Sequence, residues 1–370
     1  MKRLLAAGAV ALALGACNDG SHRSAQPIPT QTLALMTAKG MSARDPILVR
    51  VYKKESELEV WKKVNGHYAL LKSYPICRWS GQLGPKVREG DRQSPEGFYD
   101  ITPRQMNPNS SYYLSFDTGF PNAYDRAHGR TGKYLMVHGD CSSMGCYAMT
   151  DAGIAEVYAI AREALAGGQR SFQFQAYPFR MTAENLAKYR DDPNMPFWRN
   201  LKQGSDHFEV TKREPKVAIC AGRYAFDTVG GGCAADPTLA PAVAQKEAQD
   251  NHEIAALVSQ GAPSVRMQYA DGSGNDAFRT GALERPANVS RPDAYAAGGQ
   301  EVAIAPKAGA KPARASLAAM TTAGIGKPAS RTPSRTVVAS ADHDEPLAYK
   351  PAKPGKGAAA RHDGKSKPAE

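Results

Sequence analysis

Residues 133–150 read KYLMVHGDCSSMGCYAMT, a short apolar run that ends on His138 and leads through a tight loop to Cys146. The run has the composition of a buried strand. Beyond the loop, residues 150–165 carry apolar side chains at helical spacing, opening on Thr150-Asp151 and closing on Gly167-Gly168. The stretch therefore predicts a strand, a loop and a helix, with a histidine and a cysteine at their junction.

Further strands are predicted on both sides of this stretch. Alternating polarity and the Asn65-Gly66 dipeptide favour an antiparallel meander at the start of the domain. Many short strands with few helices indicate a mainly β (α+β) domain, a sandwich or partly closed barrel with peripheral helices. The predicted strands are residues 47–52, 57–61, 68–72, 97–101, 112–116 and 171–177, and the predicted further helices are 30–39, 182–189 and 242–258.

The 370-residue chain divides into segments of different composition. Residues 31–240 form one globular unit, residues 241–300 are an uncertain helical or linker region, and residues 301–370 form a tail predicted to be disordered. Twelve Lys and Arg against six Asp and Glu give this Ala/Pro-rich tail +6 of the chain's formal +11. The charge favours either a tether to an anionic wall or membrane surface or a solvated linker. Few aromatic residues interleave with it, so nucleic-acid binding is not expected.

The N-terminus has the pattern of an exported lipoprotein. Residues 1–16 combine Lys2 and Arg3 with an apolar run and small residues, as in a signal peptide. The following Cys17 completes LGAC, which resembles the bacterial lipobox and implies lipidation there, with residues 17–30 as a linker. Asn18 favours the outer membrane, so the expected location is the periplasm of a Gram-negative bacterium. A cleaved signal peptide with an incidental cysteine is the alternative.

The chain has six cysteines. An exported protein meets an oxidising compartment, where unused thiols tend to form disulfides. Cys220 and Cys233 enclose a short loop and are predicted to form a disulfide. Cys77, Cys141 and Cys146 then form an odd set, which indicates a free reactive thiol. Whether Cys77 pairs with Cys141 stays open, and a Cys141–Cys146 disulfide would instead block the site. No second close pair of Cys or His completes a zinc site, so neither metal nor cofactor is predicted.

Cys146 and His138 are the candidate nucleophile and base. A thiol attacks as thiolate, and both a nearby imidazole and a helix N-terminus lower its pKa. Gly145 would admit a carbonyl group, and the backbone N–H groups from Gly145 to Tyr147 could form an oxyanion hole. The alternative is a disulfide-bonded Cys146 beside a core histidine.

The motif VHGDCSSMGCYAM, together with GQLGPKVREGDRQSPEGFYDI at residues 81–101, resembles the YkuD family of L,D-transpeptidases, and most closely its YafK branch. The resemblance covers about residues 40–210. It implies a YkuD-like fold in which Cys146 is the nucleophile and His138 the base. The carbonyl of Gly139 would orient the imidazole, and Ser143 and Gly145 match the residues that precede the nucleophile.

The implied activity is acyl transfer through a thioester at the diaminopimelate of wall stem peptides. The acceptor is an amine in crosslinking or lipoprotein attachment, or water in the release of wall-attached lipoprotein. A wall-binding lipoprotein without catalysis is the rival from another class. Met144 stands where the wider family has histidine, and the loop before the nucleophile is shortened, which leaves the acceptor undecided.

Other charged residues in the sequence are alternative candidates for a functional role. His128-Gly129 also fits the wider family's spacing to the nucleophile, but it lies in a charged loop rather than at a strand end. The Ser94–Gly97 segment is better explained as a turn that starts a strand than as an acid/base pair. A basic loop could bind a substrate carboxylate through Lys86, Arg88 and Arg92. The alternative is that the loop is merely solvated and binds no ligand.

Overall fold

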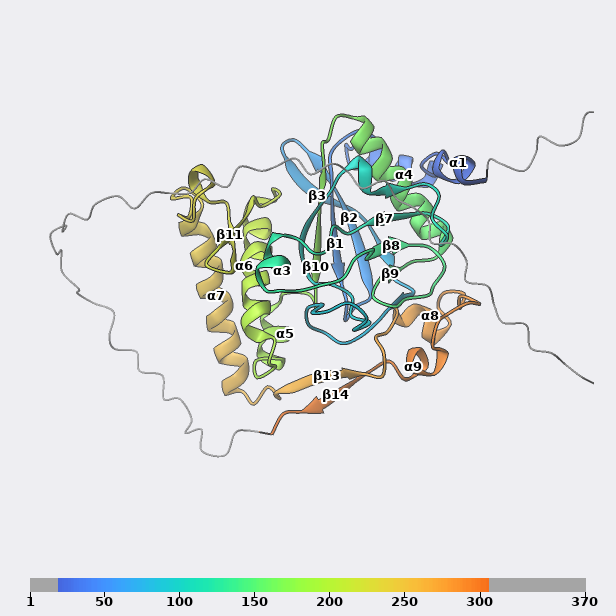
Figure 1. Cartoon of the computed structure of the whole chain (residues 1–370). Coiled ribbons are helices and arrows are strands. Elements are labelled where there is room, and N and C mark those ends of the chain that lie inside the picture. Colours follow the sequence, from blue (N-terminus) through green and yellow to red (C-terminus); the bar gives the residue numbers. More distant parts are fainter. Residues whose placement is uncertain (1–18, 306–370) are drawn as a thin grey trace, which may run out of the picture. The chain divides into compact units, whose positions relative to one another are not determined.

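The computed structural model describes residues 19–305. The predicted signal peptide, the lipidation of Cys17 and residues 306–370 of the predicted tail lie outside the described residues. The tail prediction is wrong at its start, because residues 301–303 belong to strand β14 (Gly299–Ala303). Two five-stranded sheets face each other across one hydrophobic core (Figure 1). The first has the order β3 (His67–Pro75), β2 (Glu57–Val64), β1 (Ile47–Tyr52), β10 (Phe172–Tyr177) and β5 (Gly97–Ile101). The second has the order β4 (Arg78–Trp79), β9 (Tyr147–Ala148), β8 (Met136–His138), β7 (Ser115–Asp117) and β6 (Met106–Asn107).

Aromatic side chains join the two sheets. Phe116 on β7 contacts Phe172 and Phe174 on β10, and Tyr147 on β9 also meets Phe174. Such edge-to-face ring contacts add to the burial of apolar area that drives folding. Each sheet is open at both ends of its strand order. The structure is thus a mixed α+β fold dominated by sheets without a closed barrel, and the predicted fold class is confirmed.

The predicted meander at the start of the domain is correct. β1, β2 and β3 pair antiparallel, and the turn between the last two uses Asn65 and Gly66, both with positive φ (50° and 85°). Asn and Gly tolerate that region of φ, which a tight hairpin requires.

Two strands next to the candidate site begin later than predicted. β7 begins at Ser115 and β8 at Met136, because Tyr113 (φ 69°) and Tyr134 (φ 58°) have a left-handed backbone. Bulky residues rarely adopt this conformation, and it interrupts an extended run. Apolar composition alone therefore placed both strand starts too early.

Helices cover the sheets. α4 (Asp151–Ala166) packs on the second sheet, and α5 (Ala183–Lys188), α6 (Met195–Thr211) and α7 (Ala240–Ser259) lie together beside the first (Figure 1). The 17-residue α6 was not predicted, because Gly204, Ser205 and Asp206 interrupt its apolar pattern. Gly204 serves close packing: a Cβ there would lie 2.4 Å from the rings of Phe98 and Phe226. The remaining helices are α1 (Asp19–Ser24), α2 (Thr30–Ala38), α3 (Ala123–Ala127), α8 (Asp276–Thr280) and α9 (Pro292–Ala297).

The region between residues 241 and 300 is structured. After α7, the hairpin of β13 (Val265–Tyr269) and β14 (Gly299–Ala303) encloses α8 and α9, and Tyr295 of α9 is fully buried. A second hairpin pairs β11 (Val217–Cys220) with β12 (Arg223–Phe226). Within residues 19–305, no helix is both long and apolar enough to span a membrane.

Candidate active site

The strand pair β8–β9 brings the predicted base and nucleophile to one face of the second sheet. The two strands are parallel, with Val137 opposite Tyr147. Both of these side chains are fully buried in the core. Because side chains alternate along a strand, His138 and Cys146 leave the core and point to the opposite face. Both line one cavity of about 260 Å³.

His138 is held in the orientation that a general base needs. Its Nδ1 lies 2.5 Å from the carbonyl oxygen of Gly139, which can only accept, so Nδ1 carries the proton and Nε2 has the free lone pair. The ring of Tyr112 lies against it, with centroids 4.7 Å apart. Burial lowers the pKa of His138 from its usual value. The imidazole is therefore neutral at pH 7 and able to accept a proton.

Gly139 leaves no room for a side chain. A Cβ at this position would lie 2.5 Å from Oδ1 of Asp151 and 2.9 Å from Cβ of Tyr113. Its N–H donates to the carbonyls of Tyr112 (3.0 Å) and Leu114 (3.2 Å). The carbonyl that orients His138 is thus fixed on both sides, in the arrangement that the family resemblance implies.

Cys146 is a free thiol, in contrast to the four other cysteines within residues 19–305. Its Sγ accepts from the N–H of Met136 at 3.4 Å and donates toward the carbonyl of Tyr134 at 3.7 Å. Burial raises the pKa of the thiol to about 11. The raised pKa of the thiol and the lowered pKa of the imidazole both favour the uncharged forms of the pair.

The prediction that a helix N-terminus lowers the pKa of the Cys146 thiol is wrong. Cys146 is followed by strand β9, and α4 begins only at Asp151. The first turn of α4 is capped by Thr150, whose Oγ1 accepts the N–H of Gly153. The helix dipole is felt mainly within the first turn, so it is not directed at the sulfur.

This electrostatic arrangement predicts the pH dependence of alkylation. A thiol with a pKa near 11 should react with iodoacetamide at a rate that rises about tenfold per pH unit from pH 7 to 10, because only thiolate reacts. Peptide mapping by mass spectrometry would report the rate at Cys146 itself. A thiolate–imidazolium pair would give a rate that is already level at pH 7, and that result would contradict the neutral pair.

The loop before Cys146 engages one of the three N–H groups that were predicted to form an oxyanion hole. Gly145 has φ 133°, and its N–H donates to Oγ of Ser143 at 3.2 Å. Tyr147 belongs to β9, and its buried hydroxyl donates to the carbonyl of Pro95 at 2.6 Å. The N–H of Cys146 has no acceptor among residues 19–305. The N–H of Gly145 is thus already engaged by Ser143, and that of Cys146 is available to a developing oxyanion.

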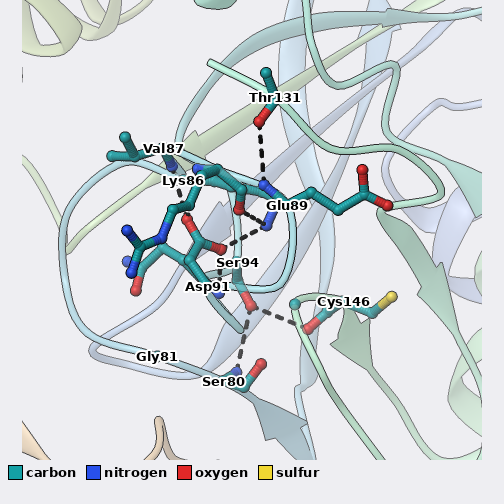
Figure 2. A network of polar contacts seen from close by, with 12 residues as sticks. Ser80, Gly81, Lys86, Val87, Glu89, Asp91, Ser94, Thr131 and Cys146 are labelled. Atoms are coloured by element: carbon teal, nitrogen blue, oxygen red, sulfur yellow. Dashed lines mark hydrogen bonds and ion pairs between the residues drawn. The ribbon is translucent and has the colours of Figure 1, made fainter.

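The carbonyl of Cys146 is bound from two sides. It accepts from Oγ of Ser143 at 2.7 Å and from Oγ of Ser94 at 3.1 Å. Figure 2 shows Ser94 between Cys146 and the N–H of Ser80. These bonds orient the peptide plane of Cys146. The sequence interpretation, which assigned Ser94 only to a turn, did not predict this contact.

The three basic residues of the predicted substrate loop have different environments. Lys86 lines the cavity, and its Nζ binds Asp91 Oδ1 (2.5 Å) and the carbonyl of Arg88 (3.0 Å) (Figure 2). Arg88 is exposed and is not among the cavity-lining residues. Arg92 binds Asp271 instead, at 2.6 Å. Lys86 is therefore the one member of the loop placed to face a substrate.

Three large, largely apolar side chains line the cavity together with charged residues. Met144 is 72% exposed, Tyr134 55% and Tyr112 43%, although all three are large. Apolar side chains gathered beside a cavity indicate a surface that binds a ligand. The two tyrosines were missed in the sequence, since nothing local distinguishes them from strand residues.

His128 lies away from this cavity. It ends α3, its Nδ1 contacts the carbonyl of Tyr124 at 2.9 Å, and it is not among the cavity-lining residues. Within residues 19–305, no group of three His, Cys, Asp or Glu side chains is arranged to hold a metal ion. The cavity therefore holds His138, and not His128, together with Cys146.

Comparison with known proteins identifies this arrangement. The model of the L,D-transpeptidase catalytic domain (YkuD) matches residues 46–166, which contain both His138 and Cys146. Over 179 residues, 48% of this chain and 73% of the relative, the sequence is 50% identical to "Putative L,D-transpeptidase YafK" of Escherichia coli K12 and equally to that of strain O157:H7. The chain belongs to the YkuD family of L,D-transpeptidases. Within that family it is similar to the YafK branch, as the motif predicted.

Two solved structures are less similar in sequence to this YkuD-family chain than the E. coli relatives are. The helical cell shape determining protein Pgp2 from Campylobacter jejuni (K307A mutant) is 16% identical, with a TM-score of 0.31 over 70% of this chain and 84% of Pgp2. Bd1075 from Bdellovibrio bacteriovorus is 13% identical, with a TM-score of 0.26 over 47% of this chain and 77% of Bd1075. TM-scores this low say nothing about function. The YkuD match ends at residue 166, so the later helices and the β13–β14 region lie beyond it.

Proposed function

We propose that this protein is a peptidoglycan-modifying cysteine enzyme that acts at the diaminopimelate of wall stem peptides. The observation that carries the proposal is the placement of Cys146 and His138 in one cavity, with Nδ1 of His138 locked on Gly139. Membership of the YkuD family supports the same substrate class. Lys86 is the predicted basic residue that lines the cavity, and a substrate carboxylate would share its Nζ with Asp91.

The proposed first half-reaction forms a thioester. Nε2 of His138 takes the proton of the Cys146 thiol as Sγ attacks the amide carbonyl at the L-centre of diaminopimelate. The carbonyl oxygen becomes an oxyanion that the N–H of Cys146 stabilises. Collapse then breaks the C–N bond, and the proton held by His138 goes to the leaving amine. The products of this step are the acyl-enzyme and a released amine.

The second half-reaction repeats these transfers with an acceptor. His138 takes a proton from an amine or from water, and that nucleophile displaces Sγ from the acyl group. An amine acceptor produces a wall crosslink or an attached lipoprotein. Water produces net hydrolysis: a wall-attached lipoprotein would already have left as the amine of the first half-reaction, and water would then release the acyl group from Cys146.

Sacculi that carry crosslinks and attached lipoprotein test the proposal. We expect the wild-type protein to alter their muropeptides, measured by mass spectrometry, and Cys146→Ala to leave them unchanged. New diaminopimelate-to-diaminopimelate links would indicate transfer to an amine, and loss of lipoprotein remnants would indicate hydrolysis. Unchanged muropeptides with folded wild-type protein would contradict the enzyme and favour a wall-binding lipoprotein.

The proposed location is the periplasm, with a lipid anchor at Cys17 in the outer membrane. The signal-like residues 1–16 and the LGAC sequence support it. Membrane fractionation of cells used for the sacculus experiment checks the anchor. Wild-type protein should be found with outer membranes and Cys17→Ser in the soluble fraction, while equal distribution of the two would contradict lipidation.

A further inference from the structure

The catalytic loop, residues 139–145, is held by a segment far along the chain. The N–H of Ser143 donates to Oγ of Ser290 at 3.0 Å. In return, the N–H of Ser290 donates to the carbonyl of Cys141 at 3.3 Å. Ser290 lies beyond the YkuD match, which ends at residue 166. A single serine thus bonds the loop at two positions on the N-terminal side of the nucleophile.

A second contact reaches the same loop through Asp271. This carboxylate is only 4% exposed and binds three guanidinium groups, those of Arg92 (2.6 Å), Arg78 (3.2 Å) and Arg291 (3.2 Å). Arg92 extends from Asp271 to the carbonyl of Ser143, at 3.2 Å. The Arg92 contacts hold the pKa of Asp271 below its usual value, so it stays ionised. Both the N–H and the carbonyl of Ser143 are therefore bound, directly or through Arg92, by this distant segment.

Ser143 transmits this restraint to the nucleophile. Its buried hydroxyl donates to the carbonyl of Cys146 at 2.7 Å and accepts the N–H of Gly145 at 3.2 Å. A third contact, with Oγ of Ser80, measures 3.0 Å. Displacement of Ser143 would rotate the peptide unit that carries Cys146 and its N–H.

The segment lies in close backbone contact with the sheet beneath the loop. A Cβ on Gly272 would lie 2.1 Å from the carbonyl oxygen of Trp79, and one on Gly274 2.2 Å from that of Cys77. Phe278 and Tyr295 pack with the disulfide that joins Cys77 to Cys141. The backbone of the segment therefore packs directly against β4 and Cys77 at these two glycines. The segment is therefore packed against the strand and the disulfide that support the catalytic loop.

We infer that residues 269–295 complete the catalytic unit, with Ser290 and Asp271 as positioning residues that hold Ser143 and, through it, Cys146. The inference rests on the proposed role of Cys146 as nucleophile. Neither Ser290 nor Asp271 lines the catalytic cavity, so they act through the loop and touch no substrate.

Alkylation of Cys146 in the full chain tests this without any wall substrate. Loss of the Ser290 hydroxyl should loosen the loop, admit water to the sulfur and lower the thiol pKa from about 11. We expect Ser290→Ala to react with iodoacetamide at pH 8 roughly 5- to 10-fold faster than wild type. The midpoint of its pH profile should move down, and Ser290→Thr, which keeps a hydroxyl, should restore the wild-type rate and midpoint. Asp271→Asn should change both in the same direction as Ser290→Ala.

The matched control is Ser264→Ala, in the same C-terminal region, where the hydroxyl binds Asp191 instead of the loop. It should alkylate as wild type does. Ser290→Ala should also turn over sacculi several-fold more slowly through kcat, with KM unchanged. A wild-type alkylation rate and pH midpoint in Ser290→Ala would overturn the inference. Lack of turnover by wild-type protein would instead count against the proposed function, since the alkylation result does not depend on substrate.

Discussion

Replacing His138 by alanine is expected to slow acylation of Cys146 by roughly 10²- to 10⁴-fold, the usual contribution of a general base. The effect should be large because burial keeps the thiol protonated, with a pKa of about 11, so attack requires proton removal. Formation of the acyl-enzyme on stem peptides can be followed as a mass increase on the Cys146 peptide. Since Nδ1 is engaged by Gly139, only Nε2 can perform this transfer.

His128→Ala is the matched control for this experiment. His128 also precedes the nucleophile and is followed by glycine, but it lies at the end of α3 and outside the cavity. Its replacement should leave acylation within about twofold of wild type, as for most surface substitutions. If His128→Ala removed acylation and His138→Ala did not, the assignment of the base would be wrong.

Lys53→Met is expected to have the largest effect on stability, lowering the free energy of unfolding by about 3–5 kcal/mol. Lys53 is fully buried, with Nζ 3.0 Å from Oε1 of Glu96, and it also donates to the carbonyls of Gly84 and Ser94. Its loss leaves Glu96 as an unpaired buried charge, whose remaining partners among residues 19–305 are the N–H of Gly84 and the indole of Trp198. Urea unfolding of the two proteins would measure the difference.

Lys62→Met provides the comparison. Lys62 is also buried, but its Nζ donates to the carbonyls of Ala43 (3.1 Å) and Asp45 (2.7 Å) and makes no ion pair within residues 19–305. Burial lowers its pKa to about 8. Removing it strands no opposite charge, so the loss should be smaller, about 1–2 kcal/mol. Adding Glu96→Gln to Lys53→Met should recover part of the lost stability, and equal losses for Lys53→Met and Lys62→Met would contradict the ion-pair argument.

The Lys53–Glu96 pair also explains why a Gly/Pro-rich stretch can carry catalytic contacts. The pair fixes Gly84 and Ser94 at either end of the loop that contains Lys86. Ser94 in turn binds the carbonyl of Cys146. The interpretation of Glu96 as part of a turn at the start of β5, and not as an acid/base residue, agrees with its burial and its pairing.

Local sequence was informative wherever the signal depends on neighbouring residues. Strand periodicity predicted β1 and β5 with their observed limits, and Asn65-Gly66 predicted the hairpin. Pattern reasoning failed for α6, because its Gly204 is selected by rings from distant strands. It failed again for the strand starts near Tyr113 and Tyr134, whose backbone conformation is imposed by the surrounding fold.

The sequence by itself determined the family, the order of strand, loop and nucleophile, and the identity of the histidine and cysteine, since each is written in a short contiguous motif. Only the tertiary structure decided that Cys77 pairs with Cys141, that Arg92 binds Asp271, and that the Cys146 thiol is neutral at rest. Pairing depends on which distant residues meet, and the pKa depends on burial. Neither is set in the unfolded chain, because residues as far apart as 92 and 271 meet only in the fold. The helix N-terminus expected at Cys146 was wrong for a local reason, because strand β9 lies between Cys146 and α4.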